Sequence, residues 1–202
     1  MTHAKILQSD RVYTFSRFFE MTVDPEELLA EFGYGLSKGK LVLPQGVADI
    51  DVEGLRSQLE EDLTYVDLSS EAARREILIA PILMRVCRSL KSKLKIEYNL
   101  NVSEFLRGSL DYYLQGAQNV VVIEAKQADL TRGFTQLAVE LIALDQWTNS
   151  DAPLLYGAVT TGDIWRFGVL DRTMKRVTQD LNLFRVPEDL PTLLSSFVGI
   201  LG

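Results

Sequence analysis

The sequence predicts a mixed α/β (α+β) fold, in which helices flank a mixed sheet, and three observations support this. A long run with helical periodicity, residues 69–90, precedes three strand-like segments, 94–102, 104–114 and 119–126. The linkers between these strands are short enough for antiparallel hairpins. A second amphipathic helix and a further strand, 153–161, then complete an αβββαβ order. The last strand–helix–strand unit predicts a parallel pair joined by a right-handed crossover.

Bulk composition sets the domain organisation and excludes some classes of protein. With 47% hydrophobic residues in 202, the chain can build one substantial core. We expect a single globular unit over residues 69–202, on which an N-terminal α/β extension, residues 1–68, packs. The net charge of −7 argues against non-specific binding to nucleic acid or anionic membrane, but it leaves room for a local basic groove. Because no apolar run reaches membrane-spanning length and no signal peptide is evident, we expect a cytoplasmic protein without membrane contact.

Cysteine and histidine usage restricts the chemistry. Cys87 is the only cysteine, so an internal disulfide is impossible. His3 is the only histidine, which effectively excludes histidine catalysis and histidine metal sites. Any site must therefore rest on carboxylates, lysine, arginine or hydroxyl groups.

The N-terminal third contains local structure signals but no functional motif. Aromatic and β-branched residues predict a strand over residues 11–20. Asp24, followed by proline and two glutamates, is typical of a helix start, and this helix continues to about Phe32. After several glycines we expect a short strand over residues 40–43. An acidic helix with one leucine stripe follows over residues 53–64.

The helix that begins after Ser69 opens the second part of the chain. Ser69 and Ser70 are suitable caps, and Glu71 lies at the positive end of the helix dipole. Pro81 lies inside the apolar pattern, where it removes a backbone hydrogen bond and should kink the helix. Basic residues in this region either interact with the helix C-terminus and solvent or form a phosphate-contacting patch, and they are Arg85, Arg88, Lys91, Lys93 and Lys95. Arg107, further along, is a further candidate for a nucleic-acid contact with Arg85, Arg88, Lys91 and Lys93.

The segment 119–126 ends in Glu124-Ala125-Lys126, which places two charges at the end of a strand that otherwise appears buried. Because side chains alternate along a strand, Glu124 and Lys126 share one face. Val120 and Val122 belong to that face, and the opposite face holds Val121, Ile123 and Ala125. Charges at such a place cost free energy unless they pair with each other, with a metal or with a substrate.

Asp111 is the only acid in the central part of the preceding strand. Plausible hairpin pairing brings it beside Glu124. Two neighbouring carboxylates repel each other, which raises at least one pKa, and a cation or lysine relieves the repulsion. The same alternation predicts that one face of this strand holds Leu106, Gly108, Leu110 and Tyr112, and that the other holds Phe105, Arg107, Ser109, Asp111 and Tyr113.

A helix capped by Asp129 or Thr131 then runs to about Trp147, with Gln136 and Glu140 on one flank of its apolar side. The strand 153–161 and the segment 164–171 form a hairpin across Thr161-Gly162-Asp163. For residues 175–202 we expect surface turns and then a docked C-terminal helix.

This order of residues resembles the PD-(D/E)xK nuclease superfamily, which has the restriction-endonuclease-like fold. The resemblance covers about residues 69–171 and rests on five features in order: a helix with an early glutamate (SEAARREILIAPIL), a strand ending in Asp (GSLDYYL), a strand ending in Glu-Ala-Lys (VVVIEAK), a helix with a glutamine ten positions on, and the hairpin TTGDIWRFGVL. Leu110 stands where the family has a proline.

The resemblance implies a site for Mg²⁺ or Mn²⁺. Asp111 and Glu124 would hold the cation together with the backbone carbonyl of Ala125, because hard oxygen ligands suit these ions. Lys126 would orient a water or stabilise charge on the phosphate. The remaining site residues would have supporting roles. Glu71 would be an outer metal ligand or an acid that contacts the metal ligands rather than the metal, and Glu76 is the alternative to it. Gln136 would support the site from the helix.

The function implied is that of a divalent-metal-dependent nuclease that hydrolyses phosphodiester bonds, with DNA as the expected substrate and RNA or a nucleotide as a weaker candidate. A homodimer or a protein partner for targeting is expected by analogy. The alternative is a non-catalytic protein-interaction module or subunit that keeps the fold. Basic residues gathered around Asp111 and Lys126 favour the nuclease, whereas a cleft closed by neighbouring side chains favours the interaction module.

Overall fold

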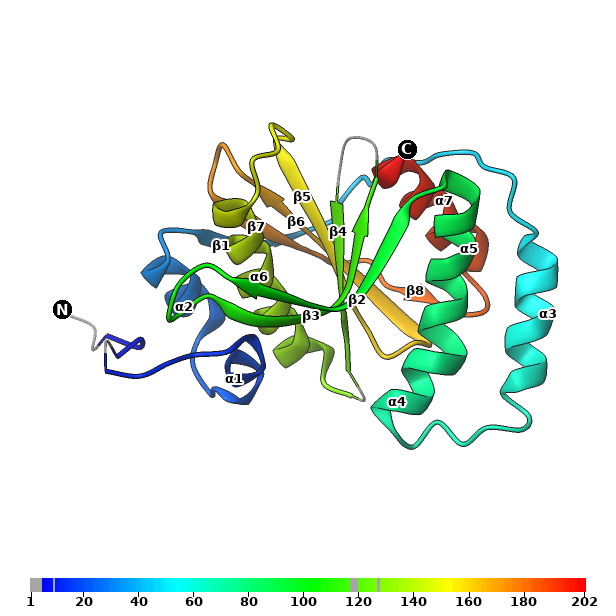
Figure 1. The fold of residues 1–202 in the computed structure, drawn as a ribbon, viewed down its shortest axis with the longest axis horizontal. Coiled ribbons are helices and arrows are strands. Elements are labelled where there is room, and N and C mark those ends of the chain that lie inside the picture. Colours follow the sequence, from blue (N-terminus) through cyan, green and yellow to red (C-terminus); the bar gives the residue numbers. More distant parts are fainter. Residues whose placement is uncertain (1–4, 9, 117–119, 127) are drawn as a thin grey trace.

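The computed structural model describes residues 5–8, 10–116, 120–126 and 128–202, so that His3 and Asn119 lie outside the described residues. Eight strands of this part form one mixed sheet with the order β1-β7-β6-β5-β4-β3-β2, and β8 pairs with β6 (Figure 1). The strands are β1 (Gly35–Gly39), β2 (Lys93–Asn101), β3 (Arg107–Gln115), β4 (Val120–Ala125), β5 (Leu154–Thr160), β6 (Ile164–Asp171), β7 (Arg176–Asp180) and β8 (Phe184–Arg185).

The central part of the sheet confirms the predicted pairing. Strands β2, β3 and β4 are joined as antiparallel neighbours. Helix α6 (Leu130–Trp147) connects β4 to β5, and these two strands are parallel. Strand β6 returns antiparallel to β5, as expected for a hairpin. The residues of the motif therefore lie in the middle of the sheet rather than at an edge strand.

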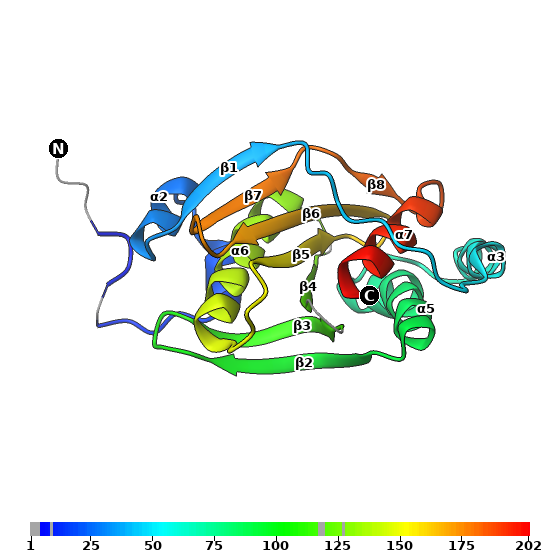
Figure 2. The same ribbon diagram turned by 90° about the horizontal axis from the view of Figure 1, so that it is seen from above.

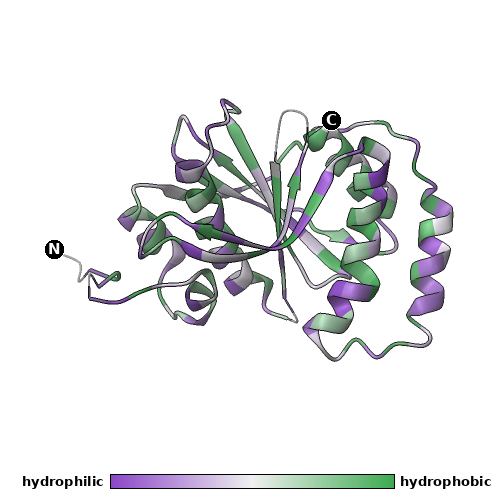
Figure 3. Cartoon of the chain, in the orientation of Figure 1, coloured by the Kyte–Doolittle hydropathy of each residue, from purple (hydrophilic) through white to green (hydrophobic). Residues whose placement is uncertain are grey.

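Helices cover both faces of the sheet, and each face has its own apolar cluster (Figure 2). The α6-side core contains α6 with α1 (Phe15–Glu20) and α2 (Pro25–Glu31). The α5-side core contains α5 (Ala80–Leu90), α7 (Leu190–Leu201) and α3 (Val52–Asp62). Hydrophilic residues lie mainly on the outer sides of these helices, as is clear for α3 in Figure 3. Burial of these apolar side chains is the main source of stability.

The long helix that precedes β2 is not regular. It consists of α4 (Glu71–Arg74), a π-helical turn η1 (Arg75–Ile79) and α5. Pro81 has no N–H to donate to the carbonyl four residues earlier. The predicted distortion therefore takes the form of a widened turn, in which the N–H of Ala80 donates to the carbonyl of Arg75. Ser70, rather than Ser69, caps the helix by accepting from the N–H of Ala73 at 3.1 Å.

Three local predictions are wrong. Residues 11–20 were expected as a strand but contain helix α1, because Phe15 and Phe18 lie one helical turn apart and both are buried in the α6-side core. The strand expected over residues 40–43 lies instead at β1, where the backbone finds a parallel partner in β7. Strand β7 itself lies where surface turns were expected, and the docked helix after it is confirmed as α7.

The N-terminal segment is part of the same sheet. It contributes the edge strand β1, and the hydroxyl of Ser37 lies 3.0 Å from that of Thr178 across the pair. Its helices α1 and α2 share the α6-side core with α6. Within the described residues, no helix is long and apolar enough to cross a membrane.

Candidate active site

The pairing of β3 with β4 brings Asp111 and Glu124 together, as the hairpin prediction requires. Tyr112 lies opposite Ile123, so Asp111 and Glu124 occupy the next position of the register. The Oδ2 atom of Asp111 accepts a hydrogen bond of 2.8 Å from the N–H of Ala125. Where the β3–β4 pairing ends, the Ala125 N–H therefore donates to a side chain instead of a backbone carbonyl. This hydrogen bond fixes the orientation of the Asp111 carboxylate.

The alternation predicted for β3 is wrong at this point. Leu110 packs in the α6-side core, whereas Tyr112 packs in the α5-side core. The break lies at Asp111, opposite Glu97, whose backbone has a φ of 52° in the left-handed region. Few residues other than glycine adopt this conformation, and here it interrupts the regular pleat of β2. On β4 the described part of the prediction is confirmed, because Val122 faces the α6-side core while Val121, Ile123 and Ala125 face the α5-side core.

Glu124 is almost fully buried, and only one of its oxygens is paired. The side chain is 1% exposed, and Oε1 contacts Nζ of Lys126. Oε2 has no hydrogen-bond partner among the described residues. Burial, reinforced by the charge of Asp111, raises the pKa of Glu124 to about 7. Within the described residues, the second oxygen of this buried carboxylate is left to a proton shared with the Glu140 carboxyl or to a cation.

Lys126 is the cation nearest to that carboxylate. Its side chain is 13% exposed, and Nζ lies 4.8 Å from the centroid of the Phe19 ring. Burial alone lowers the pKa of Lys126, but the charges of Glu124, Asp111 and Glu71 outweigh it, and the net shift is upward. The side chain is therefore an ammonium ion held on the Glu124 carboxylate.

Glu140, on α6, is a site residue that the sequence did not single out. It is fully buried, and its Oε1 accepts a hydrogen bond of 2.9 Å from Nε2 of Gln136. Burial and the adjacent charge of Glu124 raise the pKa of Glu140 well above its ordinary value. The Oε2 of Glu140 and the Oε1 of Gln136 have no partner in the described part of the chain. An acid in the otherwise apolar run 137–144 of this helix is the signal that could have identified it.

Arg75 is a second residue that sequence reasoning missed. Its Nη1 lies 2.6 Å from Oε1 of Glu97 and 3.6 Å from Oδ1 of Asp111. Burial raises the pKa of Asp111, and the Ala125 hydrogen bond and the charge of Arg75 reduce this effect without cancelling it. Arg75 follows Glu71 by four residues, and this i, i+4 spacing on one helix face could have identified it.

The two alternatives for the acid on the first helix differ in their environment. Glu71 is half-buried, and its charge raises the pKa of both Asp111 and Lys126. Glu76 is exposed and lines a pocket of about 270 Å³ with Arg85 and Arg88. Glu71 is therefore the acid that acts electrostatically on the site.

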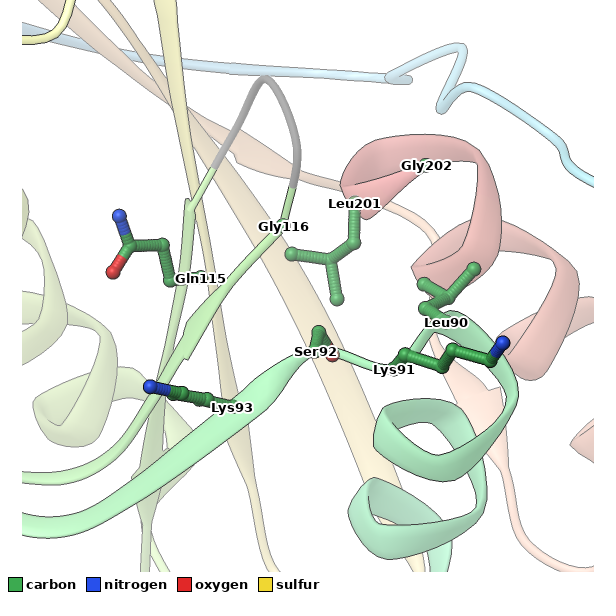
Figure 4. Close-up of a pocket in the computed structure, with 8 residues that line it drawn as sticks. All are labelled: Leu90, Lys91, Ser92, Lys93, Gln115, Gly116, Leu201 and Gly202. Carbon is green, nitrogen blue, oxygen red and sulfur yellow. The ribbon is translucent and has the colours of Figure 1, made fainter.

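The predicted basic residues lie in separate places. Arg85 and Arg88 line the pocket near Gln58 on α3. Lys91 and Lys93 line a different pocket of about 390 Å³, where their side chains extend in opposite directions (Figure 4). Arg107 pairs with Asn101 at the start of β3. These residues do not form one groove around Asp111 and Lys126, so the expected electrostatic signature of a nuclease is not met by them.

The Lys91–Lys93 pocket belongs to the opposite end of the strands. Gln115, which lines it, pairs with Val120 at the start of β4, four residues before Glu124. At about 3.3 Å per residue this separation is roughly 13 Å.

The oxygen donors at the motif suit a small hard cation. Asp111 and Glu124 supply carboxylates, and Mg²⁺ is commonly held by one or two carboxylates and several waters. The buried, unpartnered Oε2 of Glu124 is the observation that fits such an ion. Among the described residues no group of three or more His, Cys, Asp or Glu side chains is arranged to hold a metal. The described residues would therefore provide only part of a coordination shell, which water and substrate would have to complete.

Comparisons of the chain with protein-family models, curated proteins and solved structures found no match. The function must therefore be inferred from the geometry of the site.

Proposed function

We propose that the protein is a divalent-metal-dependent nuclease that hydrolyses phosphodiester bonds in DNA, built on a restriction-endonuclease-like core of the PD-(D/E)xK superfamily. The observation that carries this proposal is the meeting of Asp111 and Glu124 on neighbouring strands, with Lys126 in contact with Glu124. Two adjacent carboxylates beside a lysine are expensive to bury unless they serve a cation or a substrate.

The arrangement of the elements supports the same proposal. The order α5, β2, β3, β4, α6 and β5 follows the expected αβββαβ sequence of the core, with antiparallel strands first and a parallel crossover last. The site lies at the end of β4, beside the start of α6, and Gln136 reaches it through Glu140.

Each residue has a defined role in the proposed hydrolysis. Asp111 and Glu124, with the backbone carbonyl of Ala125, would hold Mg²⁺ or Mn²⁺, which polarises a phosphate oxygen and lowers the pKa of bound water. A water oxygen would form a bond to phosphorus and release one proton to solvent, while the bond to the leaving oxygen would break and that oxygen would take up a proton from solvent. The Lys126 ammonium stabilises the negative charge that develops on the phosphate. Glu71 adds negative charge near Lys126 and contributes, after Glu124 and Asp111, to the upward shift of the Lys126 pKa.

A second candidate function is a non-catalytic interaction module or subunit that keeps this fold. The observation that favours it is that Arg75 and Lys126 already neutralise the two carboxylates. The separation of the predicted basic residues and the net charge of −7 agree with this alternative. A nuclease of this charge is expected to need a homodimer or a protein partner to engage duplex DNA.

The test is cleavage of supercoiled, linear and single-stranded DNA, and of RNA, in Mg²⁺ or Mn²⁺. Asp111→Asn removes one charge but keeps an oxygen that can accept from the Ala125 N–H, so it is preferable to alanine. It is compared with Lys126→Ala and with Asp151→Asn, a control at an exposed position.

The proposal predicts cleavage that chelator, Asp111→Asn and Lys126→Ala each abolish, while Asp151→Asn is unaffected. Cleavage of RNA alone would redirect the proposal to an RNA phosphodiesterase. If the native protein binds no Mn²⁺ in a titration followed by electron paramagnetic resonance and cleaves nothing, the interaction module is the correct account.

A further inference from the structure

Arg75 lies at the site but is not tied to Asp111 alone. Its guanidinium is closer to Glu97 (2.6 Å) than to Asp111 (3.6 Å), and it lies 5.1 Å from the centroid of the Tyr112 ring. Its side chain is 20% exposed, so part of the group meets solvent. The described contacts are made through Nε and Nη1, which leaves the Nη2 donors for a ligand.

The local backbone is distorted in two places that together position this arginine. Arg75 begins the π-helical turn η1, and such turns occur frequently at functional sites. Glu97, its closest partner, has a left-handed backbone in the middle of β2. A strained backbone persists only where the surrounding structure enforces it, and such strain is concentrated at active sites and ligand clamps. Tyr112 adds a hydrogen bond of 3.4 Å from its hydroxyl to the Arg75 carbonyl.

A pocket of about 290 Å³ opens beside the guanidinium. It is lined by Ala72, Arg75, Glu76, Ala80, Ile96 and Tyr112. Ile96 pairs with Tyr112 in the β2–β3 ladder, yet its side chain is 55% exposed. A ligand that enters this pocket reaches Arg75 and, through it, the Asp111 carboxylate.

We propose that Arg75 binds a phosphate of the nucleic-acid strand next to the bond that is cleaved, with Glu97 and Tyr112 holding its guanidinium in place. This inference rests on the proposed nuclease function and names the substrate contact that the predicted basic residues do not supply. Arginine suits this role because its planar, forked donors match the oxygens of a phosphate. A cation held by Asp111 and Glu124 takes over the charge of Asp111 and frees Arg75 to bind the anionic substrate.

The competing role is structural, in which Arg75 only orients Asp111. The two roles differ in what is lost when the arginine is removed. A phosphate contact contributes to DNA affinity and to its dependence on salt, whereas an orienting contact contributes to metal affinity.

The experiment compares Arg75→Ala, Arg75→Gln and Arg75→Lys with the native protein and with Arg185→Ala. Arg185 is a matched control because its side chain is 66% exposed and pairs only with Asp189 in the described part of the chain. Affinity for a fluorescent oligonucleotide is measured by anisotropy in Ca²⁺ over a series of salt concentrations. Mn²⁺ affinity is measured separately by electron paramagnetic resonance, cleavage is measured in Mg²⁺, and circular dichroism confirms that each variant is folded.

For Arg75→Ala and Arg75→Gln, loss of one charged contact predicts DNA affinity lower by on the order of 10- to 100-fold. The slope of log affinity against log salt should fall in magnitude by about 0.7 to 0.9 for the lost phosphate contact. Mn²⁺ affinity should not fall, Arg75→Lys should restore the salt slope but only part of the affinity, and Arg185→Ala should match the native protein.

Two results overturn the inference while leaving the nuclease proposal intact. In the first result, the native protein cleaves DNA, and the folded Arg75→Ala and Arg75→Gln variants bind the oligonucleotide with the native affinity and salt slope. The other is a fall in Mn²⁺ affinity with an unchanged salt slope, which assigns Arg75 to orienting Asp111. A native protein that neither binds nor cleaves any nucleic acid defeats the proposed function, and this inference with it.

Discussion

Glu140→Gln should stabilise the metal-free protein at neutral pH, although it changes a fully buried residue. In the native protein, burial and the charge of Glu124 raise the pKa of Glu140, whereas a hydrogen bond with Glu140 lowers the pKa of Glu124. The variant keeps the oxygen that accepts from Gln136. Its new amide N–H₂ can donate to Glu124 in place of the carboxyl proton, so the substitution removes a buried acid and keeps this hydrogen bond.

The magnitude follows from the proton linkage. The pKa of Glu140 in the folded protein lies well above its ordinary value of 4.5, so above pH 4.5 the unfolded chain loses a proton that the folded protein keeps. The free energy of unfolding therefore falls as pH rises from 4.5 toward the folded pKa. Each pH unit contributes about 1.36 kcal/mol, so at pH 7 the native protein loses as much as about 3 kcal/mol that the Glu140→Gln variant retains. Well below pH 4.5 both states keep the proton and the linkage contribution vanishes.

The assay is urea denaturation with EDTA at pH 5 and at pH 7, followed by circular dichroism. Glu60→Gln, at an exposed position on α3, is the control and should change stability by less than about 0.5 kcal/mol at both pH values. The reasoning is refuted if the advantage of Glu140→Gln over the native protein is not larger at pH 7 than at pH 5. A variant that is less stable than the native protein at both pH values would show that the Glu140 carboxyl makes a favourable contact that the amide cannot replace.

Three further predictions follow from the site and its supports. Mg²⁺ at 100 times its dissociation constant should raise the free energy of unfolding by about 2.7 kcal/mol, and thermal melts of Asp111→Asn should show no such increase. Gly133→Ala should reduce cleavage in the Mg²⁺ assay although alanine favours helix by about 1 kcal/mol, because its Cβ would lie 2.7 Å from Cγ2 of Val159 and 2.9 Å from Cγ of Lys126; undiminished activity contradicts this. Gly108→Ala should destabilise the protein by about 1–3 kcal/mol in urea, because φ is +148° and the Cβ would lie 2.8 Å from Phe15; native-like stability contradicts it.

Most elements around the site were predictable because their signals are local. The strands that carry Asp111 and Glu124 follow one another through short linkers, so antiparallel pairing was the natural expectation. The helix that carries Gln136 has a capping Asp129 and a long apolar stripe, and it runs to Trp147 as predicted. Because these two strands are neighbours, the register of their pairing alone brings Asp111 close to Glu124.

The errors occurred where a distant partner decides the conformation. Residues 11–20 have a composition typical of a strand, yet Phe15 and Phe18 are buried as one face of a short helix beneath α6. Strand β1 is short and contains two glycines, and it is a strand because β7, about 140 residues later, pairs with it. Local propensity cannot predict such an element, because the free energy that selects it comes from contacts far apart in the chain.

The sequence by itself determined the αβββαβ order, the strand that ends in Glu124 and Lys126, and the carboxylate of Asp111 beside it, because periodicity and short linkers act over a few residues. Only the tertiary structure placed Arg75 between Glu97 and Asp111 and buried Glu140 beside Glu124. It also placed the candidate nucleic-acid-binding residues Arg85 and Arg88 at a different pocket from Lys91 and Lys93. The physical reason is that the pairing of a charge depends on which faces of separate elements meet, and this is fixed by packing of the whole core.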